Sequence, residues 1–222
     1  MIPWVHLDTA AIPGAGELRL KRRGAEFSIM LGANELMNSR LSGSEEALAA
    51  LAAERLRDIV APHVLIGGLG MGFTLRAALA ALGPDAAITV VELVPAVVIW
   101  ARGPMSEIFA GSLDDARVQI KEKDVGTVIR ARSAAYDAIL LDVDNGPEGL
   151  TRQSNDRLYD SAGLAAAKAA LRPGGVLAVW SSGPDAAFVA RLKRSGFTVE
   201  EAKVRAHKGR SGARHVIWLA RA

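Results

Sequence analysis

The chain of 222 residues contains no cysteine, and aromatic residues make up only 5% of it. The absence of cysteine excludes disulfide scaffolds, thiolate zinc sites and cysteine nucleophiles, and it leaves the redox compartment undetermined. No stretch approaches the roughly 18 apolar residues of a membrane helix, and residues 1–8 lack the basic start and apolar run of a signal peptide. We therefore expect a soluble, cytoplasmic protein that does not enter a membrane.

Charge of one sign is also scarce, because the formal net charge is only +3. Basic residues gather in two places, at 21–23 and in a loop within 203–214. Such a loop would meet phosphates in an RNA-modifying enzyme, but it has no interleaved aromatic residues, so we expect no nucleic-acid partner. The four histidines show no metal-ligand spacing, and no metal is expected. The four tryptophans fit either ordinary packing or a subunit interface, which leaves a homodimer open.

The first part of the chain has the alternating pattern of short strands. From 17 to 40, apolar and polar residues alternate and two turns interrupt them, which predicts a short β-meander. Ser42 and Glu45 have capping-box spacing at the start of an Ala- and Leu-rich helical run that extends to Arg57. We expect residues 1–45 to form a small appendage and residues 46–222 to form the main domain.

From His63 onward, short β-branched runs alternate with helical runs. The strands are expected at 64–67, 88–92, 117–121, 138–142 and 176–180, and a helix is expected after each of them. Five successive βα units predict a parallel sheet with helices on both faces. Residues 197–204 and 215–220 are two further strand-like runs without a helix between them, so we expect a seven-stranded, mostly parallel, Rossmann-like α/β sheet that ends in an antiparallel hairpin.

A glycine loop lies between the first of these strands and its helix. Gly68, Gly70 and Gly72 have the spacing G-x-G-x-G, where a Cβ would obstruct both a tight turn and the approach of a ligand. The dinucleotide fingerprint G-x-G-x-x-G is absent, which disfavours a pyrophosphate cofactor. S-adenosylmethionine carries no phosphate, and the shorter pattern suits it.

Two acids follow the next two strands in the order that such a cofactor requires. Glu92 ends the second strand, where a carboxylate can accept hydrogen bonds from both ribose hydroxyls. Asp124 and the adjoining Val125 follow the third strand, where an acid can bind the adenine amino group, although Asp124 also suits a helix cap. The cofactor-binding residues predicted from the sequence are therefore Gly68, Gly70, Gly72, Glu92, Asp124, Val125 and Asp142.

The sequence resembles the spermidine synthase-like family of S-adenosylmethionine-dependent transferases. The matching segments are 63–72, 91–95, 136–142 and 171–177, and together they extend from 63 to about 181. The meander is similar in kind to the small β-subdomain that those synthases place before their Rossmann-like part. The resemblance implies a class I methyltransferase fold and either S-adenosylmethionine or its decarboxylated form as cofactor, without a metal.

The segment after the fourth strand departs from the family. Aminopropyltransferases of this family carry D-S-[ST]-D-P there, and the second Asp deprotonates the attacking amine, whereas residues 142–147 read DVDNGP. Asp142 matches the first acid, but Asn145 occupies the place of the second and cannot act as a base. Asp142 and Asp144 are the candidate catalytic residues: Asp142 would orient the donor tail or the acceptor, and Asp144 would be the base or acceptor anchor. A plain turn at 144–147 is an alternative.

Three functions are compatible with these residues. The first is methyl transfer to a small, amine-bearing acceptor. The second is aminopropyl transfer from decarboxylated S-adenosylmethionine, which the resemblance favours. Two departures oppose it: the altered segment at 142–147, and the absence of the family's Tyr-His-Glu, in whose place this sequence has Ser44, Glu45 and Glu46. The third is a non-catalytic nucleoside-binding protein. Asn155 and Tyr159 are expected either to line the acceptor pocket or, for Tyr159, to pack on the next helix.

Overall fold

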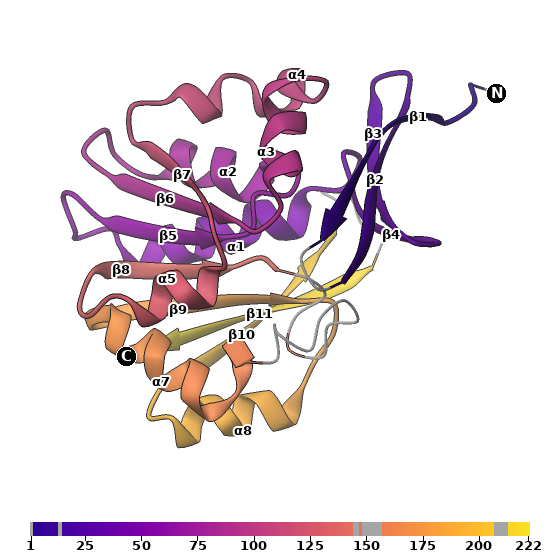
Figure 1. Ribbon diagram of the computed structural model, residues 1–222. Coiled ribbons are helices and arrows are strands. Elements are labelled where there is room, and N and C mark those ends of the chain that lie inside the picture. The colour runs from indigo at the N-terminus through magenta and orange to yellow at the C-terminus, as the bar shows by residue number, and fades with distance from the viewer. Residues whose placement is uncertain (1, 13–14, 144–146, 148–156, 207–212) are drawn as a thin grey trace.

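The computed structural model describes residues 2–12, 15–143, 147, 157–206 and 213–222. The first four strands form a separate antiparallel sheet in the order β1-β2-β3-β4. Their bounds are Val5–Ile12 (β1), Ala15–Arg23 (β2), Glu26–Leu31 (β3) and Asn34–Asn38 (β4). This small sheet stands beside the rest of the molecule, at the end where the chain begins (Figure 1).

The main sheet has seven strands in the order β10-β11-β9-β8-β5-β6-β7. The strands are His63–Gly67 (β5), Ala87–Glu92 (β6), Val118–Glu122 (β7), Tyr136–Leu141 (β8), Leu171–Ser181 (β9), Thr198–Arg205 (β10) and Arg214–Arg221 (β11). Strands β5 to β9 pair in parallel, while β11 runs antiparallel to both of its neighbours. Strands β6 and β7 lie on one side of β5, and the later strands, from β8 onward, lie on its other side. The expected parallel sheet with a terminal antiparallel hairpin is confirmed.

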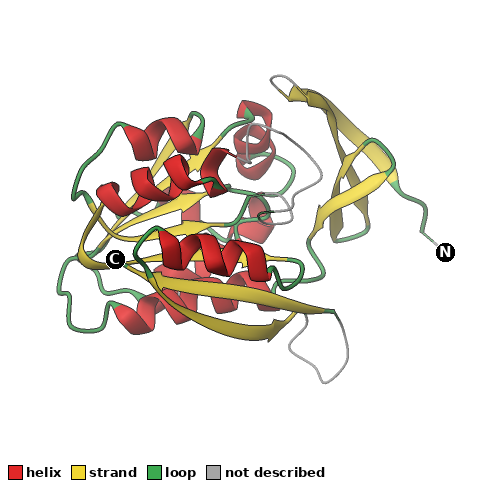
Figure 2. Cartoon of the chain, turned by 90° about the horizontal axis from the view of Figure 1, so that it is seen from below, coloured by secondary structure: helices red, strands yellow, loops and turns green. Residues whose placement is uncertain are grey.

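Helices cover both faces of the main sheet (Figure 2). Their bounds are Gly43–Arg55 (α1), Phe73–Ala81 (α2), Pro95–Arg102 (α3), Ser106–Phe109 (α4), Val125–Arg130 (α5), Ser161–Ala170 (α7) and Ala186–Arg194 (α8), with a short 3₁₀ turn at Ser112–Asp114 (η1). Buried residues of α1, α2 and α3 share one hydrophobic core with the apolar face of the small sheet. Buried residues of α5, α7 and α8 form a second core on the opposite face.

Two sequence predictions about the first part of the chain need correction. Strand β1 was not expected, because most of its residues are exposed and the pattern alternates weakly. The capping box is wrong: Ser42 occupies the N-cap of α1 but makes no side-chain cap hydrogen bond, and the Glu45 carboxylate accepts one from Ser44 instead. Because α1 begins at Gly43, the proposed division after residue 45 falls within its first turn.

No helix of the described residues is long and apolar enough to cross a membrane. In the same part of the chain, no group of three His, Asp or Glu side chains is arranged to hold a metal ion.

Candidate nucleoside and amine site

The glycine loop turns from the end of β5 into α2. Gly68, Gly70 and Gly72 all have positive φ, at 89°, 50° and 76°. A Cβ at Gly68 would lie 2.4 Å from the backbone oxygen of Asp142, so glycine allows β5 to end directly against the end of β8. A Cβ at Gly72 would lie 2.3 Å from the Phe109 ring, which means that packing as well as ligand approach requires glycine there.

Glu92 holds the glycine loop in place. Its side chain is only 8% exposed, and its two carboxylate oxygens accept hydrogen bonds of 2.9 Å from the N–H groups of Leu69 and Val94. Burial raises the pKa of Glu92, and the backbone N–H donors lower it in part. Each carboxylate oxygen can accept a further hydrogen bond. The predicted contact with ribose thus remains compatible with this second role, which the sequence did not reveal.

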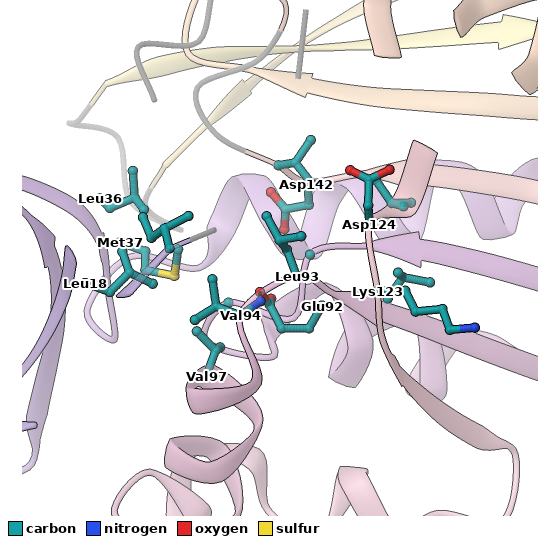
Figure 3. Close-up of a pocket in the computed structure, with 16 residues that line it drawn as sticks. Leu18, Leu36, Met37, Glu92, Leu93, Val94, Val97, Lys123, Asp124 and Asp142 are labelled. Carbon is teal, nitrogen blue, oxygen red and sulfur yellow. Dashed lines mark hydrogen bonds between the residues drawn. The ribbon is translucent and has the colours of Figure 1, made fainter. Parts of the chain in front are cut away.

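A pocket opens between this loop, the carboxyl ends of the parallel strands and the small sheet (Figure 3). Its total space, including open solvent at the mouth, is about 790 Å³. In Figure 3, Leu18, Leu36 and Met37 of the small sheet face Asp124 across the pocket. The lining residues are Ile12, Leu18, Leu36, Met37, Gly68, Gly70, Val91, Glu92, Leu93, Val94, Val97, Lys123, Asp124, Val125, Asp142 and Val143. The structure thus brings six of the predicted cofactor residues into one pocket.

Asp124 both lines this pocket and caps a helix. Its Oδ1 accepts a hydrogen bond of 2.7 Å from the Thr127 N–H at the start of α5, and the Thr127 hydroxyl lies 3.1 Å away. The capping alternative is therefore correct, and it does not exclude a ligand contact through the second oxygen. Val125 is buried and forms the adjacent wall.

Asp142 lies where two pockets meet. It lines the first pocket and a second one, and its Oδ2 accepts a hydrogen bond of 2.6 Å from the Thr74 hydroxyl. Burial, and secondarily the charge of Glu45, raise the pKa of Asp142 to about 7. A carboxyl group with this pKa is half protonated at neutral pH, which is unusual for an aspartate and typical of functional sites.

The second pocket lies beyond Gly70 and is bounded by α1, the glycine loop and the end of β9. Its lining residues are Leu36, Met37, Asn38, Glu45, Leu69, Gly70, Met71, Gly72, Phe73, Asp142 and Trp180. Gly72 lines this pocket and not the first one. Glu45 and Trp180 were not predicted as site residues, because the sequence assigned Glu45 to a helix cap and Trp180, at the end of a strand, to packing or a subunit interface.

Several predicted residues lie elsewhere. Asp144, Asn145 and Asn155 fall outside the described residues, and so does the 207–212 part of the basic loop. Tyr159 is buried, and its ring packs edge-on against Phe188 at 5.7 Å, which supports the packing alternative.

The fold is similar to that of known transferases. Spermidine synthase from Thermotoga maritima matches with a TM-score of 0.75 and 17% identity, over 97% of this chain and 72% of that one. A 1,6-didemethyltoxoflavin-N1-methyltransferase from Burkholderia thailandensis matches with a TM-score of 0.57 and 19% identity, over 81% of this chain and 78% of that one. These likenesses define the class I methyltransferase-like fold.

The family follows from the sequence match. Residues 45–186 match the model of the spermine/spermidine synthase domain, and the chain belongs to that family. It is 34% identical over 127 residues to the polyamine aminopropyltransferase of Mycobacterium tuberculosis (strain H37Rv), over 56% of this chain and 23% of that protein. Polyamine aminopropyltransferase 2 of Pseudomonas aeruginosa is 32% identical over 137 residues, over 59% of this chain and 35% of that protein. The chain therefore spans about a quarter to a third of the length of these curated relatives.

Proposed function

We propose that the protein transfers an aminopropyl group from decarboxylated S-adenosylmethionine to a small amine acceptor. The observation that carries this proposal is the charge of the second pocket. Its described lining contains two carboxylates, Glu45 and Asp142, and no lysine, arginine or histidine. A donor tail that ends in an ammonium group is favoured there, whereas the α-carboxylate of S-adenosylmethionine would face two acids without a compensating base.

The first pocket fits the nucleoside of this donor. Apolar side chains line most of it, Glu92 lies at the end of β6 and Asp124 at the start of α5. The two pockets share Gly70 and Asp142. A ligand whose nucleoside occupies the first pocket would therefore extend its sulfonium tail past Asp142 into the second.

The family match supports aminopropyl transfer over methyl transfer, which the sequence analysis placed first. The curated relatives are named polyamine aminopropyltransferases. A spermidine synthase structure in complex with the transition state analogue AdoDATO matches with a TM-score of 0.74 and 17% identity. The altered segment at 142–147 concerns the base and not the binding of the donor.

The proposed reaction needs little beyond positioning and one proton acceptor. When bound, decarboxylated S-adenosylmethionine supplies an alkyl carbon that its sulfonium makes electrophilic. The acceptor nitrogen forms a bond to this carbon while the carbon–sulfur bond breaks, which leaves 5′-methylthioadenosine, and one proton leaves the nitrogen. In this scheme Glu92 and Asp124 hold the nucleoside and Asp142 orients the tail, while Asp144 stays the proposed proton acceptor.

Calorimetry and turnover test the proposal. Decarboxylated S-adenosylmethionine should bind at least tenfold more tightly than S-adenosylmethionine, and 5′-methylthioadenosine should also bind. Mass spectrometry should detect an aminopropylated product with diaminoalkanes of three to five carbons. Tighter binding of S-adenosylmethionine together with a methylated product would establish methyl transfer instead. Nucleoside binding without any product would establish the non-catalytic alternative.

A further inference from the structure

Glu45 is held by a chain of hydrogen bonds that begins on the last strand of the sheet. The Ser44 hydroxyl donates to Glu45 Oε2 at 2.7 Å, and His215 Nδ1 lies 2.9 Å from the same hydroxyl oxygen. Ser44 is fully buried and has a single hydroxyl proton, so while that proton is donated to ionised Glu45, His215 is the donor in its own contact. In this arrangement, which uses the imidazole tautomer protonated on Nδ1, the chain runs from His215 through Ser44 to Glu45.

Glu45 and Asp142 are also linked through α2. The Thr74 hydroxyl that donates to Asp142 lies 3.4 Å from the backbone oxygen of Glu45. Ion pairs within the described residues include no lysine or arginine beside either carboxylate. Two neighbouring acids in a low-dielectric site without a cation are unfavourable when both are ionised, so the pair either retains a proton or is stabilised by a ligand that supplies the positive charge.

Trp180 adds an aromatic side chain to this pocket. Its side chain lines the pocket and is 9% exposed. The indole nitrogen is buried and has no acceptor among the described residues. An indole ring is a favourable surface for an ammonium group.

We propose that Glu45 is the residue that selects the ammonium tail of the donor, as the partner of Asp142, and that Ser44 and His215 are positioning residues for it. This inference rests on the proposed function. It assigns the selectivity for the decarboxylated donor over S-adenosylmethionine to Glu45, which replaces part of the family's Tyr-His-Glu segment. Gly70 leaves the path between the nucleoside and this carboxylate pair open. The donor's amine then lies between Glu45 and Asp142.

The protonation of the site follows from the same geometry. Burial raises the pKa of Glu45, and the neighbouring Glu46 adds to this effect, while the hydrogen bond from Ser44 lowers it. The groups that face the pair are Glu46 and Ser44 of α1, Thr74 of α2 and, through Ser44, His215 of β11, whose pKa burial lowers. A bound ammonium group favours the ionised pair, so the donor should displace a proton and bind more tightly as the pH rises from 6 to 8.

The first experiment is calorimetry on the full chain and its Glu45→Gln variant. The affinity for decarboxylated S-adenosylmethionine should fall about ten- to a hundredfold, the range expected for losing one charge-assisted contact. The affinity for S-adenosylmethionine should stay constant or rise, so the preference between the two donors should largely disappear. 5′-Methylthioadenosine, which has no ammonium group, should bind both proteins equally and report an intact nucleoside pocket.

Glu46→Gln is the matched control, because Glu46 is the next residue of the same helix but lines a groove between α1 and α2. The charge of Glu46 is the smallest of the effects on the pKa of Glu45, so Glu46→Gln should keep the donor preference of the unmodified protein. If Glu45→Gln keeps that preference while 5′-methylthioadenosine still binds, the assignment of Glu45 is wrong and the proposed function stands. If the unmodified protein itself has no preference for the decarboxylated donor, the proposed function fails first.

The positioning roles are tested at His215. His215→Leu should reduce the preference for the decarboxylated donor about three- to tenfold and leave 5′-methylthioadenosine binding unchanged. His215→Asn retains an N–H donor near the position of Nδ1 and should restore most of the preference. If His215→Leu and His215→Asn have the same preference for the decarboxylated donor, the N–H donor of His215 has no positioning role. His215 would then serve only to pack against Trp180, whose ring lies 4.8 Å away.

Discussion

At the scale of single residues, Asp142 combines its proposed role in donor binding with a cost to stability. Thr74 is the one donor to its carboxylate among the described residues, and the protein packed around it raises its pKa from 3.8 to about 7. A carboxyl group whose pKa is raised by folding stabilises the native state in its protonated form. That contribution is fully present below pH 3.8 and is lost as the pH rises to 7.

Asp142→Asn should therefore become more stable than the unmodified protein as the pH rises. The amide cannot ionise, and its oxygen can still accept the Thr74 hydrogen bond. With about 1.4 kcal/mol for each unit of pH between 5 and the raised pKa of about 7, the difference in unfolding free energy should change by about 3 kcal/mol between pH 5 and pH 8 in favour of the variant. Urea denaturation at four pH values measures it.

The same variant should lose most of its affinity for the decarboxylated donor, so stability and binding change in opposite directions. Thr74→Val is a useful comparison, because it removes the hydrogen bond and leaves the carboxylate ionisable. Parallel stability profiles of Asp142→Asn and the unmodified protein over this pH range would contradict the raised pKa.

At the scale of elements, α5 begins at a residue with two duties. The Asp124 side chain caps the helix through the Thr127 N–H and also lines the nucleoside pocket. An N-cap role requires only one oxygen acceptor, whereas the Asp124 carboxylate has a second oxygen that can accept from an adenine amino group while the first caps the helix. The two duties can therefore be separated by substitution.

Asp124→Ser should keep the stability of the protein and weaken nucleoside binding. Serine is an effective N-cap, so the unfolding free energy should change by less than about 0.5 kcal/mol, while Asp124→Ala should lose about 1 kcal/mol. The affinity for 5′-methylthioadenosine should fall several-fold in both variants. Thermal denaturation and calorimetry provide the two measurements, and unaltered nucleoside affinity in Asp124→Ser would reduce Asp124 to a cap.

At the scale of the whole molecule, the small sheet completes the nucleoside pocket. Its apolar face joins the core formed by α1, α2 and α3, and Ile12, Leu18, Leu36 and Met37 reach the ligand site. A hydrogen bond of 2.7 Å from Trp100 Nε1 on α3 to Asp8 Oδ2 on β1 ties the two parts together and contributes most to the lowered pKa of Asp8. A homodimer, which the sequence left open, stays a prediction.

Trp100→Phe should loosen the small sheet without removing it. The substitution keeps the apolar packing of a side chain that is 2% exposed and deletes the N–H donor to Asp8. Relative to the unmodified protein, the substitution should accelerate amide hydrogen exchange in β1 more than in β5. The affinity for 5′-methylthioadenosine should fall, because the small sheet, which forms one wall of the first pocket, is less well ordered. Unchanged exchange in β1 would show that apolar packing alone holds the sheet.

The sequence by itself determined the main sheet and several of the residues that line the first pocket. Hydrophobic periodicity identified the five βα units and the final hairpin, because period-2 and period-3.6 patterns are local properties of the chain. Gly68, Glu92, Asp124 and Asp142 could be placed because the carboxyl ends of parallel strands lie on the same edge of a sheet. Strand β1 was missed because an exposed strand does not need alternation.

Only the tertiary structure decided the composition of the second pocket. Glu45 and Trp180, which line it, come from α1 and β9, and His215, which contacts Ser44 next to Glu45, comes from β11. No local pattern relates positions so far apart. The sequence motif that suggested a capping box contained Glu45, but Glu45 instead accepts a hydrogen bond from the buried Ser44, which His215 contacts, and lines the pocket that Asp142 also lines. The glycine loop thus indicated the kind of nucleoside. Long-range packing created the acidic pocket, and from this pocket we infer the charge of the donor's tail.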